Sequence, residues 1–548
     1  MTAPIEPGWL SLLPPLVTIV LALVFREVVS SLFAGIWLGA LFMEGGDPLT
    51  ATLRSVDQYV FGALVDEPSH INIIVFSLLL GGMVGVMTRC GGTHGIVEVL
   101  RPLATSRRRG QLAAWLGGVL IFFDDYTNTL IVGNTMRPIT DRLNISREKL
   151  SYIVDSTAAP VSAIAVISTW IGFEISLIQE SLAQAAGSMT DPALRANLLV
   201  ASEGAFVVFL HSIPYLFYPI LTLVFVLLIA TTGRDFGAMR RAEARAAGGG
   251  GVHRRDAVLA GENAEETTTP LKGVPRRWHN AALPVLTVVV TVLLGLYFSG
   301  RAAAGAADPS LLEIMGAADP FKSLLWGSFL GCAVSIGLAT TQRLLTVQQA
   351  IDAWLGGLRS MMLAMVILSL AWGLSAITVA LGTAPYLSTI LQDTLPIQAL
   401  PVLAFVVAAA ISFATGTSWG TMSILFPVVV PLAVAMGVGT DFVGGDQYSI
   451  FLGVISSVIA GSVFGDHCSP ISDTTVMSSM ASACDHIDHV RTQLPYALTV
   501  AGVAVLAGNI PTALGLSPWI SLGIGAVLLA GILRYFGRTT ERFPVLPA

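Results

Sequence analysis

Residues 465–475 read GDHCSPISDTT, and they stand inside a stretch that is otherwise apolar. The run from Ile450 to Ile455 precedes them, and Val476 and Met477 follow. Because about 20 apolar residues are enough for a helix to cross a bilayer, these polar side chains fall where lipid would be the solvent. Pro470 removes a backbone donor and clashes with the preceding turn, so it predicts a break in the helix. The stretch therefore predicts an interrupted membrane helix with polar groups at its broken ends.

The whole chain has the composition of a membrane protein. Of its 548 residues, 54% are hydrophobic and 12% are charged, and the mean hydropathy is +0.75. A soluble domain carries about 25% charged residues, and the period-2 alternation of a membrane β-barrel is absent. We therefore predict an all-α polytopic protein of the cell inner (cytoplasmic) membrane. Spans are expected at 9–25, 28–43, 70–89, 147–185 (interrupted), 206–231, 280–299, 321–341, 359–382, 449–483 (interrupted), 493–514 and 516–536.

Two further stretches, 111–141 and 397–440, run apolar, then polar, then apolar again, which is typical of a re-entrant hairpin. The longest polar segment, 233–279, holds nine Lys/Arg and six Asp/Glu together with a Gly/Ala run. This composition predicts a flexible linker between two halves. The positive-inside rule places the linker in the cytoplasm and the N-terminus outside.

Four pairs of short motifs recur in the same order in the two halves, about 290–311 residues apart. They are VDQYVFGAL (56–64) with IDAWLGGL (351–358), GGTHGIVEVL (91–100) with LGTAPYLSTIL (381–391), FFDDYTNT (122–129) with SFATGTSWGT (412–421), and DSTAAPVSA (155–163) with DHCSPISDT (466–474). The chain crosses the membrane an odd number of times between equivalent positions, which predicts inverted-topology repeats of the kind found in secondary transporters. The expected division is a first repeat at 1–232, the linker at 233–279, a second repeat at 280–515, and an extra span with a tail at 516–548.

Carboxylates in apolar surroundings are the candidate functional groups. A broken helix leaves unpaired backbone groups and partial charges that can hold ions, and oxygen-rich sites with carboxylates suit hard cations, to which Na⁺ belongs by extension. The alternative is that each carboxylate only caps a helix or stabilises a hairpin. His467 is a ligand, a proton carrier or a packed ring. The carboxylates are Asp124, Asp125, Asp155, Asp466 and Asp473.

Other polar motifs are assigned less specific roles. The run CDHIDHVR at 484–491 has no standard zinc spacing, and we favour an interfacial network around Arg491 over a metal site. Glu174 and His211 have no companion motif and are interpreted as packing or interfacial residues. There is no phosphate-binding G-x-x-x-x-G-K-[ST] loop and no nucleophile–base arrangement, so we expect neither ATP-driven pumping, nor an enzyme, nor a nucleic-acid partner.

The stretch 464–498, FGDHCSPISDTTVMSSMASACDHIDHVRTQLPYAL, resembles the NhaC family of Na⁺/H⁺ antiporters, as do FFDDYTN (122–128), CGGTHGI (90–96) and ATGTSWGT (414–421). The resemblance covers most of the chain except the linker and the extreme C-terminus. It implies two hairpins, two interrupted helices, an elevator-like motion and a homodimer. It also implies an ion and substrate site, with Na⁺ held by Asp124, Asp125, Asn128, Asp466 and Asp473. The full set of implied site residues is Asp124, Asp125, Thr127, Asn128, Asp155, Ser156, Thr157, Thr415, Thr417, Ser418, Asp466, Ser469, Ser472, Asp473 and Thr474.

Three functions stay open at this point. The first is exchange of Na⁺ for H⁺, with carboxylates that alternate between protonated and cation-bound states and with no other cofactor. The second is Na⁺- or H⁺-coupled transport of a small organic acid or amino acid on the same fold. The third is a membrane sensor or scaffold whose output is the linker, which would leave the intramembrane carboxylates as an unexplained cost.

Overall fold

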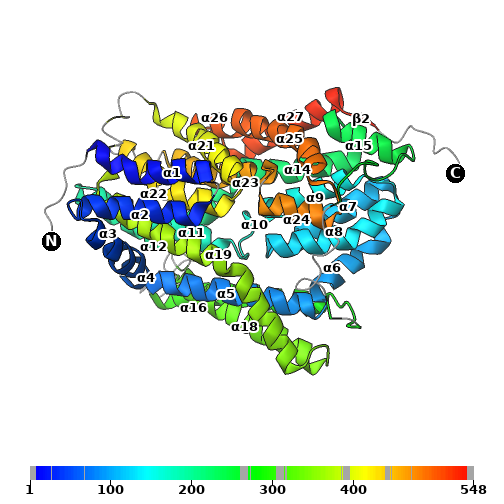
Figure 1. Ribbon diagram of the computed structural model, residues 1–548, viewed down its shortest axis with the longest axis horizontal. Coiled ribbons are helices and arrows are strands. Elements are labelled where there is room, and N and C mark those ends of the chain that lie inside the picture. The colour runs from blue at the N-terminus through cyan, green and yellow to red at the C-terminus, as the bar shows by residue number, and fades with distance from the viewer. Residues whose placement is uncertain are drawn as a thin grey trace.

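The computed structural model describes residues 8–25, 27–66, 68–259, 270–271, 273–303, 314, 318–383, 386, 390, 395–437, 445, 447–470 and 472–539. These residues form a helical protein with one short two-stranded sheet (Figure 1). Within them, nine helices are long and apolar enough to cross a membrane. One further pair, bent by 78° at Gly204, passes the same test as a unit. The prediction of an all-α polytopic membrane protein is confirmed.

The elements of the first half follow one another in chain order. They are η1 (Trp9–Leu12), α1 (Leu13–Phe25), α2 (Val28–Met43), α3 (Pro48–Arg54), η2 (Ser55–Val60), α4 (Phe61–Asp66), α5 (Pro68–Arg89), α6 (Gly92–Leu100), η3 (Arg101–Leu103), α7 (Arg107–Leu120), α8 (Asp125–Arg142), α9 (Arg147–Ser156), α10 (Ala159–Ser162), α11 (Ile171–Ser188), α12 (Pro192–Glu203), α13 (Ala205–Ser212), η4 (Ile213–Tyr215) and α14 (Phe217–Thr232).

The linker segment and the second half continue the series. They contain β1 (Arg234–Asp235), α15 (Gly237–Ala247), α16 (His279–Ala303), α18 (Pro320–Thr341), α19 (Val347–Ala380), η5 (Ile397–Ala399), α21 (Leu400–Thr415), α22 (Ser418–Met436), α23 (Tyr448–Cys468), α24 (Asp473–Ala481), α25 (His486–Val503), η6 (Ala504–Asn509), α26 (Ile510–Ala513), α27 (Pro518–Phe536) and β2 (Arg538–Thr539). The two strands pair antiparallel, with Arg234 opposite Thr539.

Helices α5, α16, α18 and α19 pack together along one side of the molecule (Figure 1), and we call them the panel. The backbones of α5 and α19 touch directly, because a Cβ added to Gly357 would lie 2.1 Å from the carbonyl oxygen of Gly81. Helix α19 is 34 residues long, and a capping box of Thr346 and Gln349 fixes its start. It therefore begins 12 residues before the predicted span 359–382.

Two helix–turn–helix pairs occupy the stretches predicted as hairpins. Helices α7 and α8 join through residues 121–124, and α21 and α22 join through Gly416 and Thr417. Gly416 has a φ of 73°, a left-handed conformation that glycine adopts without strain. Thr417 then caps α22 by accepting a hydrogen bond from the Gly420 amide at 3.3 Å. Both turns are confirmed, whereas the re-entrant path stays a prediction.

Both predicted helix breaks are present. Helix α9 ends at Ser156 and is followed by the four-residue α10, whose second residue is Pro160. Helix α23 ends at Cys468, and α24 starts at Asp473 after the turn that contains Pro470. After the first break the chain stays irregular from 163 to 170 before α11 begins. The inverted relation of the two halves stays a prediction.

The linker is more ordered than its composition predicted. Over 234–259 it forms β1 and α15, and α15 packs on α9 and α25. The buried Lys149 amine forms an ion pair with Asp235, and the Tyr496 hydroxyl donates to the same carboxylate at 2.6 Å. A further ion pair joins Arg107 to Glu243 at 2.7 Å. The expected flexibility is therefore wrong for this part, while residues 260–269 and 272 lie outside the described residues.

Candidate functional site

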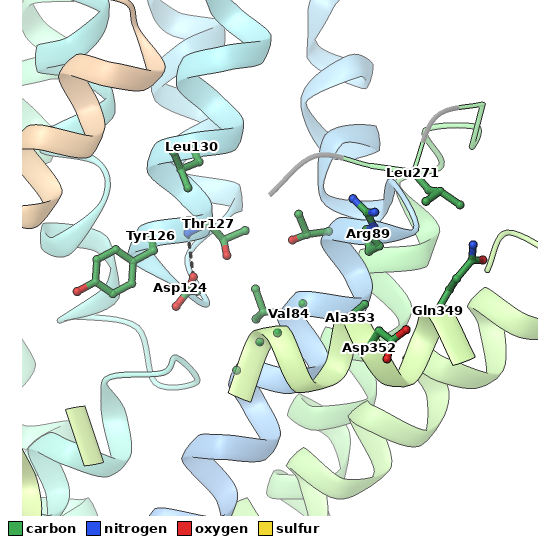
Figure 2. A pocket seen from close by; sticks show the side chains of 15 residues that line it. Val84, Arg89, Asp124, Tyr126, Thr127, Leu130, Leu271, Gln349, Asp352 and Ala353 are labelled. Carbon is green, nitrogen blue, oxygen red and sulfur yellow. Dashed lines mark hydrogen bonds between the residues drawn. The ribbon is translucent and has the colours of Figure 1, made fainter. Parts of the chain in front are cut away.

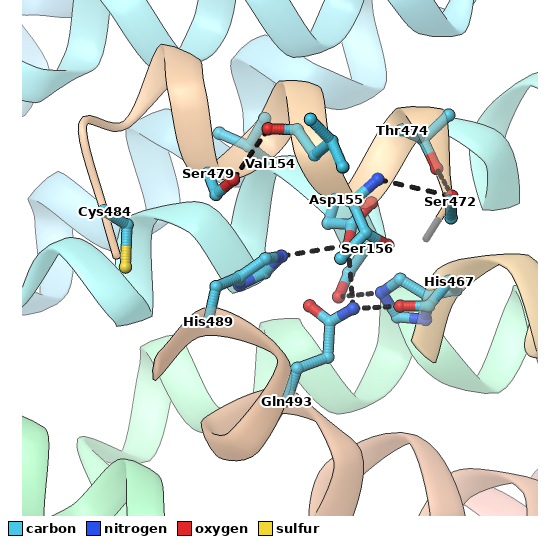
Figure 3. A network of polar contacts seen from close by, with 12 residues as sticks. Val154, Asp155, Ser156, His467, Ser472, Thr474, Ser479, Cys484, His489 and Gln493 are labelled. Atoms are coloured by element: carbon cyan, nitrogen blue, oxygen red, sulfur yellow. Dashed lines mark hydrogen bonds and ion pairs between the residues drawn. The ribbon is translucent and has the colours of Figure 1, made fainter. Parts of the chain in front are cut away.

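Asp155 stands on the last turn of α9, and its carboxylate is the centre of a buried polar network (Figure 3). One of its oxygens, Oδ2, accepts a hydrogen bond from Gln493 Nε2 at 2.7 Å. The same oxygen lies 3.1 Å from His489 Nε2 and accepts from Thr475 Oγ1 at 3.2 Å. Three groups from α24 and α25 thus converge on one carboxylate, an arrangement that stabilises its charged form.

His467 connects this network to the end of α23. Its Nε2 lies 3.1 Å from the Ser156 hydroxyl, and its Nδ1 lies 2.6 Å from the Tyr218 hydroxyl on α14. The His467 carbonyl also accepts from the Gln493 amide. Since both ring nitrogens have hydroxyl partners, the ring is more than packing and sits where it can pass a proton between α9 and α14.

Asp466, which precedes His467 in the chain, forms a second centre at the break between α23 and α24. The Ser418 hydroxyl, at the start of α22, donates to Asp466 Oδ2 at 2.7 Å. Ser472 donates to the other oxygen and lies 3.0 Å from Thr474 Oγ1. Hydroxyl oxygens from hairpin α21–α22 and from the break therefore surround this carboxylate, which is buried at 2% exposure.

The tip of hairpin α7–α8 makes its own contacts. Asp124 caps α8 by accepting from the Thr127 amide at 2.8 Å, and its other oxygen accepts from Thr169 Oγ1 at 3.1 Å. Asn128 donates to the Thr157 carbonyl at 2.7 Å, so it fastens this hairpin to the break after α9. Asp125 is buried beside them at 2% exposure.

The remaining predicted residues do not all turn toward the carboxylates. Thr415 donates to Ile411 of its own helix at 2.8 Å, and Thr157 donates to Ile153 at 2.9 Å. Ser469 donates to the Phe413 carbonyl at 2.7 Å and ties the break to α21. The backbone of Asp473 starts α24, but its side chain lies outside the described residues.

The expected single Na⁺ site stays a prediction, because the Asp473 side chain lies outside the described residues. Asp466 contacts Ser418 and Ser472, whereas Asp124 contacts Thr127 and Thr169. Within the described part of the chain, no three His, Cys, Asp or Glu side chains are grouped closely enough to hold a metal ion. The structure thus shows carboxylate centres at Asp155 and Asp466, joined through Thr475, and a hairpin tip with its own contacts.

Four partners of these centres are not among the predicted site residues. They are Thr475, in the stretch 465–475, His489, in the motif at 484–491, Gln493 and Tyr218. Gln493 and Tyr218 each stand as a polar residue inside an apolar stretch, and polar groups in spans mark functional positions. That signal was available for Gln493 and Tyr218, but no motif singled them out.

The motif at 484–491 forms a polar network with the linker, and the arginine in it is Arg254 rather than the predicted Arg491. Arg254 of the linker donates to Asp488 at 2.6 Å, while Arg491 is exposed. Asp485 caps α25 and accepts from the Val258 amide at 2.8 Å. Burial raises the pKa of Asp485, but backbone amide donors outweigh it and hold that pKa below its usual value.

A cavity of about 360 Å³ lies between hairpin α7–α8 and the panel. Asp124 and Thr127 line one side, and Figure 2 shows Arg89, Gln349 and Asp352 on the other. The cavity thus joins a hairpin tip to charged side chains of α5 and α19. Its remaining lining residues are Gly81, Val84, Gly85, Thr88, Tyr126, Leu130, Leu271, Ala353, Gly356 and Gly357.

Comparison with known proteins identifies the family. Residues 164–508 match the Na⁺/H⁺ antiporter family. An uncharacterized protein of Haemophilus influenzae is 35% identical over 497 residues, which cover 90% of this chain and 88% of the relative. The malate-2H⁺/Na⁺-lactate antiporter of Bacillus subtilis is 33% identical over 89 residues, 16% of this chain and 17% of that protein.

The fold is similar to that of the YdaH transporter of Alcanivorax borkumensis, with a TM-score of 0.53 at 16% identity over 88% of this chain and 89% of that one. At this identity the similarity concerns the fold alone. The family match begins after the first helix break and Asp155, runs through α11 to η6, and includes Asp466, His467, His489 and Gln493. This chain therefore belongs to the Na⁺/H⁺ antiporter family of membrane transporters, and it is not an enzyme.

Proposed function

We propose that the protein exchanges Na⁺ for H⁺ across the cytoplasmic membrane, as a homodimer with an elevator-type motion. The observation that carries the proposal is the pair of buried carboxylates, Asp155 and Asp466, at two helix breaks that face each other. Charged groups inside a membrane protein are costly and mark ion pathways. Here each carboxylate is surrounded by hydroxyl, amide or imidazole groups rather than by a permanent cation.

Asp466 is the proposed cation site. The Ser418 and Ser472 hydroxyls donate to the carboxylate here, and the Thr474 hydroxyl is hydrogen-bonded to Ser472. All three hydroxyls can rotate to offer lone pairs to a cation. Hard cations favour such oxygen ligands, and Na⁺ belongs to this group by extension. Because Ser418 comes from hairpin α21–α22, movement of that hairpin would open or complete the site.

Asp155 and the two imidazoles are the proposed proton site. His489 contacts the carboxylate directly, and His467 contacts the hydroxyl of Ser156, the next residue along the chain. An imidazole can hold a proton on either ring nitrogen, and it donates through both when it is charged. A proton gained here weakens the negative potential that holds a cation at Asp466, so that one ion displaces the other.

The second candidate is coupled transport of a small organic acid or amino acid. The observation that favours it is the 360 Å³ cavity, which is larger than a bare ion needs and has both Arg89 and Asp352 in its lining. These opposite charges suit a cargo with its own charged groups. A relative that exchanges malate, protons, Na⁺ and lactate, as its name states, is consistent with such a cargo.

Purified protein in liposomes loaded with a pH-sensitive dye tests both candidates. We expect saturable proton movement on addition of Na⁺, lost in Asp466→Asn and kept in Asp485→Asn, a matched change in the interfacial network. Proton movement that persists in Asp466→Asn would reject the cation site. Absence of Na⁺-driven movement in folded wild-type protein, together with uptake of labelled malate or an amino acid, would instead select the second candidate.

A further inference from the structure

Glu174 on α11 is a buried carboxyl that the proposed exchange site does not use. It is 0% exposed, and neither of its carboxyl oxygens has a hydrogen-bond partner among the described residues. Asp155 and Asp466 differ from it, since donors surround both. An ionised carboxylate buried without a partner costs several kcal/mol, so such a group keeps its proton instead.

A second unpartnered polar group lies one turn earlier on the same helix. The indole Nε1 of Trp170 is buried and has no hydrogen-bond partner within the described chain. Glu174 donates its backbone amide to the Trp170 carbonyl at 3.0 Å, and side chains four residues apart share one face of a helix. The start of α11 therefore carries two buried polar groups, an N–H donor and a carboxyl, that are hydrogen-bonded neither to each other nor to any other described residue.

The start of α11 touches both hairpins. The Trp170 ring lies 5.5 Å from the Trp419 ring on α22, and Phe173 lies 4.3 Å from the same ring. Thr169, just before α11, donates to Asp124 at the tip of hairpin α7–α8. A movement of either hairpin would therefore change the surroundings of the first turn of α11, which contains Glu174.

Charged groups on the neighbouring elements do not compensate Glu174. Glu180, further along α11, has its own partners, because it lies 3.6 Å from His70 and accepts from Ser375 at 3.0 Å. Helix α22, which packs on α11, carries no titratable side chain. The other described titratable groups of the helices packed on α11 are Arg89 of α5, Arg195 and Glu203 of α12, His211 of α13, and Asp352 and Arg359 of α19.

We propose that Glu174 is a proton-binding site separate from the Asp155 and Asp466 centres. The proton is bound in this conformation, and it is released when hairpin movement parts α11 from α22 and lets water reach the carboxyl. The role in transport rests on the proposed function, whereas the bound proton rests only on the burial and missing partners of Glu174. No bond other than the carboxyl O–H forms or breaks.

Infrared spectroscopy of the purified full-length protein tests the bound proton directly. A protonated carboxyl has a carbonyl stretch that an ionised one lacks. We expect this band at neutral pH, its loss in Glu174→Gln, a shift in Glu174→Asp, and its retention in Glu180→Gln, the matched control on the same helix. Identical spectra for wild type and Glu174→Gln would overturn the proposal.

Transport measurements test the role of the proton. Glutamine keeps the size and neutrality of the protonated side chain but cannot release a proton, so Glu174→Gln should fold, unfold at the wild-type temperature and lose proton exchange. Wild-type exchange with an unchanged pH profile in this variant would overturn the transport role. If the infrared band is present but wild-type protein shows no Na⁺-driven flux, the proposed exchange fails while the proton site stands.

Discussion

Replacing Asn128 with leucine should release hairpin α7–α8 from the helix break. The Asn128 amide donates to the carbonyls of Gly118, Ile121 and Thr157 at 2.7, 3.1 and 2.7 Å. The Gly118 oxygen keeps a second donor, the Ile121 amide at 3.2 Å, so the loss falls on the other two carbonyls. A buried acceptor left without a donor costs about 1–3 kcal/mol. Two such carbonyls cost about 2–6 kcal/mol together. The gain from burying leucine is about 1.5–3 kcal/mol, so we expect a net loss of about 2 kcal/mol.

Thermal unfolding of purified protein in detergent measures this loss. The matched control is Thr129→Val on the same helix, because the Thr129 hydroxyl is buried and has no partner within the described residues. Removing an unsatisfied hydroxyl should be neutral or stabilising. Asn128→Leu should also lose ion exchange, because Asn128 joins the hairpin to Thr157, which lies beside the proposed proton site. Equal unfolding temperatures for the two variants would refute the role of Asn128 in holding hairpin α7–α8 to the helix break after α9.

Three further predictions concern parts outside the carboxylate centres. Burial lowers the pKa of His94 from 6.5 to about 4. Its contribution to stability is therefore complete above pH 6.5 and is lost as the pH falls toward 4. His94→Gln should make the unfolding temperature less dependent on pH over that range. Gly357→Ala should cost about 1–3 kcal/mol by overpacking, whereas Gly356→Ala, with nothing within 4 Å of its added Cβ, should be tolerated in the same unfolding assay. Lys149→Met should lower the free energy of unfolding by about 3–5 kcal/mol, because it leaves the buried Asp235 carboxylate without its ion-pair partner. Adding Asp235→Asn should recover part of that loss.

Local chemistry explains why the helix breaks and hairpin turns were predictable. Pro160 and Pro470 lie at the two predicted breaks. Proline alone does not fix a break, because Pro427 and Pro431 lie inside the continuous helix α22. The turn at Gly416 needs a left-handed residue, and the caps at Asp124 and Thr417 are side chains that favour helix starts. Such signals operate over four or five residues, so a single sequence contains them in full.

Contacts between distant segments explain what could not be predicted. The Arg/Glu-rich composition of 234–259 is typical of a solvated linker, but its order comes from partners far along the chain, such as Glu148 for Arg245 and Asp488 for Arg254. No residue near Arg254 indicates that pairing. Likewise, Gln493 becomes a ligand of Asp155 only because α25 packs on α9, which the pattern of either helix alone does not specify.

The two carboxylate centres differ in which half of the chain supplies their partners. Asp155 belongs to the first half, and its three donors, Thr475, His489 and Gln493, all belong to the second. Asp466 accepts from Ser418 and Ser472 of its own half. The Asp155 contacts join α9 of the first half to α24 and α25 of the second, whereas the Asp466 contacts can change when one hairpin moves within its half. A transported cation must enter and leave its site. This asymmetry therefore favours Asp466 as the cation site and Asp155, whose partners stay in place, as the proton site.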